Sequence, residues 1–415
     1  MRRHPALQTS EAAVKLAIVH DWLTGMRGGE KCLEVLCRRF PDATLFTLLH
    51  KRGSVSAAIE RMEIRTSFLQ RVLGIGRHYR WWLPLMPAAI EAIRIPNDVD
   101  LVLSFSHAVA KSVRPPAGVP HVCYCFTPMR YAWHRRADYL AAGGARAAVA
   151  RPLLDWLRRW DRATSRRVTH YVAISRTVAE RIRECYGRTS RVIYPPVDTA
   201  FYTPGSGPRE DFYLCVSALV PYKRIDLAVE ACKRLGRRLV VIGSGPQRRP
   251  LSRLAGSNVK LLGWQSDEVV RDYFRRARAV LFPAHEDFGI VPLEAQACGT
   301  PVIAYGRGGA TETVIEGRPG TGLFFRPQTA DALARAIRRF ESEPGSCCPG
   351  RARRQAERFA AERFERELVG YLQSVHQAAG QHGRPFRGSG LPSQRPTPSR
   401  QKAGRIALGG LRRMG

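Results

Sequence analysis

An apolar strand, a short loop and a helix in direct succession constrain the fold of this chain more than any other feature. Residues 279–283, Ala-Val-Leu-Phe-Pro, predict a buried parallel strand, and Pro292 followed by Leu-Glu-Ala-Gln-Ala predicts a helix that begins at this proline. Gly299 is expected to end that helix. Such a unit places backbone N–H groups at the carboxyl edge of a parallel sheet, where α/β proteins bind ligands. The stretch therefore predicts an α/β protein with a ligand site at this edge.

Two glutamates bracket the loop of this unit. Glu286 leaves the strand, and Glu294 lies eight positions later on the first turn of the predicted helix. Carboxylates at this edge can accept hydrogen bonds from hydroxyl groups without the help of a metal ion. For Glu294 a structural alternative is that its charge only complements the helix dipole.

The glutamate pair, with Phe288-Gly289 inside it and Gly-Thr-Pro at 299–301 after it, resembles the E-x7-E motif of retaining glycosyltransferases. The family is glycosyltransferase family 4, whose members have the GT-B fold of two Rossmann-like domains facing across a cleft. The resemblance extends from Lys15 to about Gln373. It is closest to the bacterial α-mannosyltransferases that use nucleotide sugars to build surface polysaccharides.

The resemblance implies a role for each part of the motif. Glu286 would bind hydroxyl groups of the donor sugar as a catalytic residue, and Glu294 would bind the ribose of the nucleoside. The backbone N–H groups that would line the donor sugar and phosphate belong to Phe288, Gly289, Ile290 and Val291.

The length of the chain and a repeated strand-helix alternation predict two domains. A chain of 415 residues exceeds what one hydrophobic core usually supports. Prolines at 195 and 196 interrupt regular structure between the two halves and predict a linker. The predicted division is a disordered N-terminus at 1–14, an acceptor-side domain at 15–196, a nucleotide-sugar domain at 197–350, a crossing helix at 351–378 and a disordered basic tail at 379–415.

Glycine-rich turns and one lysine predict the phosphate side of the site. Gly28 and Gly29 lie between the first predicted strand and a helix, and Gly243 ends a predicted strand of the second half. For the first pair, a tight turn without a ligand is the alternative. The resemblance implies that the first loop faces the donor phosphates and that Lys223 neutralises the donor diphosphate.

In the family, basic residues that bind the donor diphosphate form a phosphate clamp, and the chain departs from the family at one of these positions. The arginine that usually precedes the lysine by five residues is Ala218 here. The resemblance therefore implies that part of the clamp is missing, or that Arg224, Arg307 or a residue of the first domain supplies it.

His107 is the second catalytic candidate. It follows a predicted strand at 101–104, and its Ser-His-Ala-Val-Ala-Lys context resembles the family histidine that faces the donor sugar. A lone histidine with a structural role is the alternative. The aromatic and basic segment at 127–134 is typical of acceptor-side loops in this group.

The charge of the chain predicts an anionic partner. The formal net charge is +32, from 67 basic and 35 acidic residues. The stretches 77–86 and 151–167 combine positive charge with apolar bulk, which is typical of a helix on an anionic bilayer surface or of a core helix with a solvated basic face. No uncharged apolar run reaches the roughly 18 residues of a membrane span, and residues 1–14 do not resemble a secretory signal. Ten cysteines without a C-x2-C pair indicate reduced thiols and no zinc site.

The resemblance, together with these residues, implies a retaining glycosyltransferase that transfers a hexose, with mannose from GDP-mannose as the expected donor, to a polyprenyl-diphosphate-linked or growing saccharide. It would need no metal or cofactor, bind no specific nucleic acid, and act in the cytoplasm, peripherally at the inner face of the plasma membrane. No residue stands out as a covalent nucleophile, so the family-based expectation is front-face attack by the acceptor hydroxyl. The alternatives are a UDP-sugar-dependent glucosyl- or galactosyltransferase and a non-enzymatic polyanion-binding protein.

Overall fold

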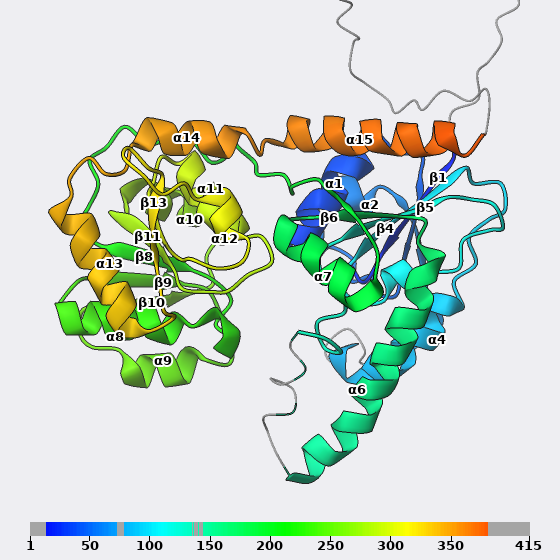
Figure 1. Ribbon diagram of the computed structural model, residues 1–415, viewed down its shortest axis with the longest axis horizontal. Coiled ribbons are helices and arrows are strands. Elements are labelled where there is room, and N and C mark those ends of the chain that lie inside the picture. The colour runs from blue at the N-terminus through cyan, green and yellow to red at the C-terminus, as the bar shows by residue number, and fades with distance from the viewer. Residues whose placement is uncertain (1–13, 73–78, 135, 137–139, 141–143, 381–415) are drawn as a thin grey trace, which may run out of the picture.

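The computed structural model (Figure 1) describes the chain except for residues 1–13, 73–78, 135, 137–139, 141–143 and 381–415. The two terminal segments predicted to be disordered lie outside the described residues, apart from Val14, Ala379 and Gly380. The described chain forms two parallel sheets with helices on both faces of each. The predicted α/β class with two Rossmann-like domains is therefore confirmed.

The first sheet has seven parallel strands in the order β3-β2-β1-β4-β5-β6-β7. These are β1 (Leu16–His20), β2 (Thr44–Thr47), β3 (Glu63–Thr66), β4 (Leu101–Ser106), β5 (His121–Cys125), β6 (His170–Ala173) and β7 (Arg191–Val192). Because side chains alternate across a strand, Leu16 and Ile18 of β1 pack into one core layer and Ala17 and Val19 into another.

Helices cover both faces of the first sheet. The face of Leu16 and Ile18 is covered by α1 (Gly28–Arg39), α2 (Ala57–Glu60) and α7 (Arg176–Tyr186). The opposite face is covered by α4 (Met86–Glu91) and α6 (Gly144–Thr164). Short 3-10 turns at Phe68–Arg71, Tyr79–Leu85, Ala110–Ser112 and Ser165–Arg167 complete this domain.

The apolar side of α6 is mostly a core surface. Leu154 and Leu157 are buried, and Leu153 and Trp160 pack against the same core. Only Trp156 of these five is exposed, with 40% of its surface accessible. The core-helix alternative therefore accounts for four of the five apolar residues.

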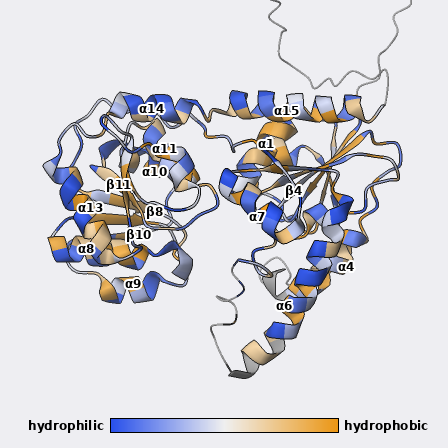
Figure 2. Ribbon diagram, in the orientation of Figure 1, coloured by the Kyte–Doolittle hydropathy of each residue, from blue (hydrophilic) through white to orange (hydrophobic). Residues whose placement is uncertain are grey.

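The second sheet has six parallel strands in the order β10-β9-β8-β11-β12-β13. These are β8 (Tyr213–Val216), β9 (Leu239–Ile242), β10 (Val259–Gly263), β11 (Ala279–Phe282), β12 (Val302–Tyr305) and β13 (Gly322–Phe325). One face is covered by α8 (Ile225–Leu235), α9 (Arg248–Leu254) and α13 (Ala330–Ser342). The other is covered by α10 (Asp267–Arg276), α11 (Ile290–Ala297), α12 (Ala310–Thr313) and α14 (Pro349–Glu357). Apolar colouring concentrates on the strands and on the helix sides that face them (Figure 2).

The chain returns to the first domain through two helices, so the single crossing helix predicted from the sequence is wrong. α14 packs on the second domain, and α15 (Ala361–Ala378) packs on the first through Phe364, Leu368 and Leu372. Figure 1 shows the two helices end to end. They are separated because Ala360 is extended and forms a β-bridge with Val197 of the interdomain linker.

Two edge strands were not predicted. β3 is largely exposed and has the polar sequence Glu-Ile-Arg-Thr, and β7 has only two residues. Neither contains the apolar run from which the central strands were predicted. Their place in the sheet comes from pairing with β2 and β6.

Candidate functional site

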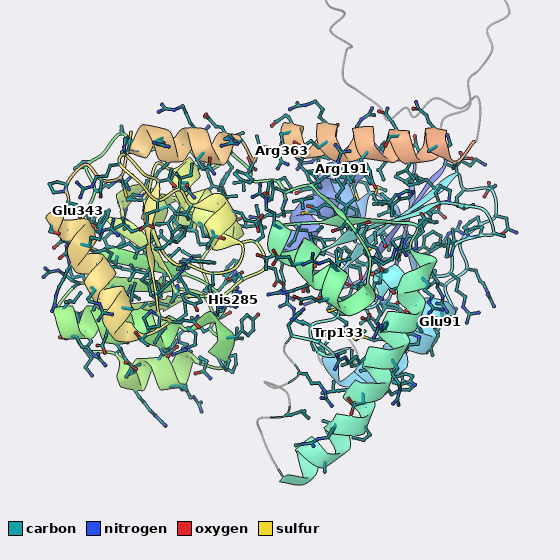
Figure 3. All side chains as sticks on the ribbon, in the orientation of Figure 1. Glu91, Trp133, Arg191, His285, Glu343 and Arg363 are labelled. Atoms are coloured by element: carbon teal, nitrogen blue, oxygen red, sulfur yellow. The ribbon has the colours of Figure 1, made fainter. Side chains whose placement is uncertain are left out.

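The candidate site lies where the carboxyl edges of the two sheets meet. The first turns of α1 and α11 touch there, because a Cβ atom added to Gly28 would lie 2.7 Å from Cδ1 of Ile290. Phe288 and Leu293, although they belong to the second domain, are part of the buried core of the first. The labelled His285 belongs to the β11–α11 loop, on the side of the second domain that faces the first (Figure 3). This loop is thus packed directly onto the opposite domain.

Glu286 is held by a lysine of its own domain. Lys223 ends the 3-10 turn Pro221–Lys223 after β8, and its Nζ forms an ion pair with Oε1 of Glu286. The two side chains are only 15% and 22% exposed. The structure therefore brings together the two residues that the sequence assigned to the diphosphate and to the sugar.

Asp287 anchors the same loop to the first domain. Its carboxylate forms an ion pair with Arg181 of α7 and accepts a hydrogen bond of 3.4 Å from Nη2 of Arg130. Its backbone carbonyl accepts a 2.5 Å hydrogen bond from Ser175, the N-cap residue of α7. Burial opposes the ionisation of Asp287, but the charges of Arg181 and Arg130 outweigh it and lower the pKa of the carboxyl group. These contacts could not be predicted from the sequence because the partners are distant in the chain.

Two glycines of a neighbouring turn shape the glutamate loop. Gly308 has a φ of +74°, and a Cβ atom on it would lie 2.4 Å from the carbonyl oxygen of Glu286. Gly309 donates a 2.8 Å hydrogen bond to the same carbonyl, and a Cβ atom on it would lie 2.2 Å from Cα of Phe288. Because the side chain of Phe288 is buried, only the backbone of the predicted donor-lining segment there can face a ligand.

Helix α11 begins two residues earlier than predicted. Ile290 is its first residue, Gly289 is its N-cap with a φ of +93°, and Pro292 occupies the third position. A proline is tolerated there because the first N–H groups of a helix have no partner within the helix. Glu294 therefore lies on the second turn. Since the effect of the helix dipole falls off within the first turn, this position weakens the purely structural alternative for Glu294.

Glu294 is paired with a lysine of the opposite domain. Its Oε1 accepts a 3.1 Å hydrogen bond from Nζ of Lys31 on α1. The side chain of Glu294 is 9% exposed and that of Lys31 is 29% exposed. The charge of Glu294 raises the pKa of Lys31 above its ordinary value, against the opposing effect of burial. This contact links the two domains across the site, and its local signal is absent because 263 positions separate the partners.

His107 is oriented by an aspartate that was not predicted from the sequence. Asp21 follows β1 directly, is fully buried, and lies 2.9 Å from Nδ1 of His107. The same carboxylate accepts backbone hydrogen bonds from His107, Ala108, Val109 and Ala110. Burial opposes its ionisation, but His107 lowers the pKa of Asp21 well below the ordinary range. Nε2 thus remains as the ring atom of His107 that can face a ligand. The acidic residue at the end of the first strand was the available signal.

Gly28 and Gly29 are the first two residues of α1. A Cβ atom on Gly29 would lie 3.3 Å from the ring of Phe126 and 3.6 Å from Nε2 of His20. Because Gly28 and Gly29 have no side chains, the amino end of α1 can pack closely against Phe126 and His20 of its own domain and against α11 of the other. The first N–H groups of a helix are a suitable site for an anion.

Gly243 permits a close approach between two loops of the second domain. Its φ is +138°, and a Cβ atom on it would lie 1.8 Å from the carbonyl oxygen of Ser217. The close approach that this glycine allows is therefore between the loops after β8 and β9, at the same sheet edge as Lys223.

The arginines proposed to replace the missing clamp residue differ in their surroundings. Arg224 pairs with Asp226 at 3.0 Å, and Arg307 is exposed in the turn after β12. Ala218 is also exposed, at the end of β8. Across the part of the chain that the structure describes, no three His, Cys, Asp or Glu side chains are arranged to hold a metal ion.

Two family models match the chain in succession. The model described as "Glycosyltransferase Family 4" matches residues 26–201, and the model described as "Glycosyl transferases group 1" matches residues 200–362. Their boundary coincides with the linker between the two sheets. The chain belongs to the GT-B glycosyltransferases.

Curated relatives of this glycosyltransferase have related names. A D-inositol 3-phosphate glycosyltransferase of Kribbella flavida is 26% identical over 370 residues, which are 78% of this chain and 84% of the relative. A GDP-mannose-dependent alpha-(1-6)-phosphatidylinositol monomannoside mannosyltransferase of Mycolicibacterium smegmatis is 33% identical over 187 residues, which cover 36% of this chain and 47% of the relative.

Solved structures share the fold of this glycosyltransferase. Anabaena HepE, in complex with UDP and glucose, has a TM-score of 0.64 and 19% identity, and the match covers 87% of this chain and 100% of HepE. The sucrose-phosphate synthase of Thermosynechococcus elongatus has a TM-score of 0.68 and 17% identity over 88% of this chain and 100% of the synthase. These matches show the GT-B architecture.

A further carboxylate of this glycosyltransferase also joins its two domains. Glu312 of α12 accepts hydrogen bonds from the backbone N–H groups of Arg176 and Thr177, the first residues of α7, at 2.9 and 3.2 Å. It also accepts a 3.0 Å hydrogen bond from the hydroxyl group of Tyr194 in the linker. An acidic group at a helix N-terminus is stabilising because it satisfies free N–H groups and complements the dipole. Glu312 thus supports the interdomain arrangement in which the site residues meet.

Proposed function

We propose that the protein is a retaining mannosyltransferase that transfers mannose from GDP-mannose to a polyprenyl-diphosphate-linked or growing saccharide of a surface polysaccharide. The observation that carries the proposal is the charge pairing of the E-x7-E glutamates inside the interdomain site. Lys223 forms an ion pair with Glu286, and Lys31 forms an ion pair with Glu294. A nucleotide sugar offers hydroxyl groups to the two carboxylates and phosphate oxygens to ammonium groups, so it can replace both contacts.

The proposed reaction is a front-face displacement at the anomeric carbon of the donor sugar. The bond between the anomeric carbon and the diphosphate oxygen breaks, and the acceptor hydroxyl oxygen bonds to the same face of the sugar while its proton passes to the departing phosphate. Lys223 and the amino end of α1 stabilise the charge that develops on the diphosphate. Glu286 holds sugar hydroxyl groups beside the reacting carbon, and His107, fixed by Asp21, faces the sugar. No metal or further cofactor takes part in this scheme.

The choice of GDP-mannose is supported by the names of two relatives. Besides the mycobacterial mannosyltransferase, a GDP-mannose-dependent monoacylated alpha-(1-6)-phosphatidylinositol monomannoside mannosyltransferase of Corynebacterium glutamicum is 35% identical over 180 residues, which are 39% of this chain and 46% of the relative. The test is a donor screen that measures nucleoside diphosphate release from GDP-mannose, UDP-glucose and UDP-galactose. We expect release of GDP from GDP-mannose. Release from the UDP-sugars alone would replace the donor assignment, and neither binding nor release with any donor would favour a non-enzymatic polyanion-binding protein.

Replacing Glu294 by alanine is expected to weaken donor binding. The nucleoside ribose would lose a charge-assisted hydrogen bond of about 1.5–3 kcal/mol, which corresponds to a Kd for GDP that is roughly 10 to 150 times higher. Isothermal titration calorimetry measures this Kd. Glu268→Ala, on the exposed side of α10 in the same domain, is the control and should bind GDP as the unchanged protein does. A folded Glu294→Ala protein with unchanged GDP affinity would remove Glu294 from the ribose site.

We also propose that the protein works at the cytoplasmic face of the plasma membrane, attached peripherally to anionic lipid. In the described part of the chain, no helix combines the length and apolar character needed to cross a bilayer. What supports attachment is the set of exposed residues on α6, which includes Trp156, Arg151, Arg159 and Arg162. Trp82 is partly buried against the core, and the side chain of Trp81 lies outside the described residues.

Co-sedimentation with vesicles tests this attachment. Each basic residue near an anionic surface contributes about 1 kcal/mol, so three or four suffice for reversible binding. We expect binding to vesicles that contain phosphatidylglycerol, weaker binding in high salt, and weaker binding of the Trp156→Ala/Arg159→Ala variant. The Arg65→Ala variant, on the exposed β3, is the control. If removal of residues 381–415 abolishes binding while the α6 variant binds normally, the terminal segment is the anchor and the α6 assignment is wrong.

A further inference from the structure

We propose that Arg130, from the first domain, supplies the second cation of the donor diphosphate clamp in place of the arginine that position 218 lacks. The inference rests on the proposed function, because it assigns one more residue to the diphosphate of the same donor. It makes the clamp an interdomain structure, with Lys223 from the second domain and Arg130 from the first.

The geometry brings both cations to the same loop. Arg130 follows β5 in the first domain and reaches across the site to Oδ2 of Asp287 at 3.4 Å. Lys223 pairs with Glu286, the preceding residue of the same loop. Consecutive residues of one loop thus hold a cation from each domain.

Arg130 is better placed to bind a ligand than the other arginine on Asp287. Arg181 forms the tighter ion pair and is 15% exposed, whereas Arg130 is 34% exposed and donates a single long hydrogen bond to Asp287. A guanidinium group has five N–H donors in a planar fork that matches phosphate oxygens. If Arg130 turns to a phosphate, Asp287 keeps Arg181 as its partner and no buried carboxylate is left uncompensated.

The neighbours of Arg130 also point to the phosphate side of the site. Burial opposes its charge, but Asp287 and, to a smaller extent, Tyr222, Tyr131 and Glu286 raise the pKa of the guanidinium group. Tyr222 directly precedes Lys223. Arg130 therefore shares its surroundings with the lysine that the proposed function assigns to the diphosphate.

The charge balance of this cluster favours an anion. Arg130, Arg181 and Lys223 provide three positive charges against the two carboxylates of Glu286 and Asp287. The remaining positive charge suits a diphosphate, which brings further negative charge to a largely desolvated site. Arg224, the alternative within the second domain, is already paired with Asp226.

Calorimetry with wild-type protein and Arg130→Ala tests the assignment, with GDP, GMP and guanosine as ligands. Loss of a charge-assisted contact to the diphosphate should raise the Kd for GDP about 10- to 100-fold and leave the Kd for guanosine unchanged. Arg136→Ala is the matched control, because Arg136 lies six residues further along and pairs with Asp155 on α6 at 2.6 Å. It should bind GDP normally. Equal losses for GDP and guanosine, or no loss for either, would overturn the proposal.

A rescue variant adds a second readout. In the Arg130→Ala background, Ala218→Arg should recover most of the GDP affinity, because it restores the cation from the opposite domain. A rescue that fails in a folded protein would place the missing charge elsewhere. If Arg130→Ala instead raises the KM of a polyprenyl-diphosphate-linked acceptor and leaves GDP binding intact, Arg130 binds the acceptor phosphate and the proposal is wrong.

These outcomes are separable from failure of the proposed function. A wild-type protein that binds neither GDP nor UDP would defeat the proposed function itself. If the wild-type protein binds UDP in place of GDP, the same comparison is made with UDP, UMP and uridine, and the assignment of Arg130 is tested unchanged.

Discussion

Replacing Asp161 by alanine is expected to destabilise the first domain by about 3–5 kcal/mol, because it would leave a buried ammonium group without its counter-charge. Asp161 and Lys111 are both inaccessible to solvent, and Nζ of Lys111 lies 2.9 Å from Oδ1 of Asp161. The other carboxylate oxygen accepts hydrogen bonds of 2.8 Å from the indole of Trp133 and from the hydroxyl of Tyr186. Trp133 lies beside α6, as Figure 3 shows. One carboxylate thus joins α6 to three other segments of the domain.

Urea unfolding followed by tryptophan fluorescence measures this loss. The Lys111→Met/Asp161→Leu double variant should recover much of it, since removing both charges avoids the uncompensated group. Asp161→Asn keeps the shape of the side chain, so its free energy of unfolding should lie between those of Asp161→Ala and the double variant. Glu63→Ala, which removes the exposed partner of Arg65 on β3, should leave the unfolding midpoint unchanged. An Asp161→Ala protein as stable as the Glu63→Ala control would contradict the assignment of a buried ion pair.

Replacing Lys223 by alanine is expected to lower kcat/KM for sugar transfer by about 10²–10³. The ammonium group would stabilise the diphosphate as its charge develops, and the loss of one such preorganised contact at a developing anion typically has this size. Glu286 would also lose its ion-pair partner in a site where both side chains are largely buried. Steady-state kinetics with the donor identified by the screen provide the measurement.

The control for this variant is Lys233→Ala on α8. Lys233 is exposed, and its Nζ donates a 3.1 Å hydrogen bond to the carbonyl oxygen of Leu254, away from the glutamate loop. It should retain the kcat/KM of the unchanged protein. If Lys223→Ala folds and retains full kcat/KM, then the diphosphate is neutralised by other groups and the mechanism proposed for Lys223 is wrong.

The central strands could be predicted because their burial on both faces requires continuous apolar runs. β1, β4 and β11 all carry such runs and occur where the sequence indicated them. The edge strand β3 could not be predicted in this way because its side chains are mostly exposed. The break between α14 and α15 depends on a bridge from Ala360 to the linker, which has no local sequence signal.

Only part of the candidate site could be predicted from the sequence. Residues that follow strands or open helices, such as Glu286, Gly28 and His107, could be recognised because such positions converge at one edge of a parallel sheet and because their sequence context resembles glycosyltransferase family 4. The residues that pair with them could not be recognised. Asp21 and Lys31 act on residues 86 and 263 positions away, and no local pattern encodes such a pairing.

The sequence by itself determined two parallel α/β domains, the linker between them and the motif of the glutamate loop, since apolar periodicity, prolines and glycines act through local backbone preferences. Only the tertiary structure decided which cation pairs with which carboxylate. Lys223 pairs with Glu286, Arg181 and Arg130 pair with Asp287, and Lys31 pairs with Glu294. Charge pairing depends on distance in space, and the packing of one domain against the other sets that distance for every pair except the first.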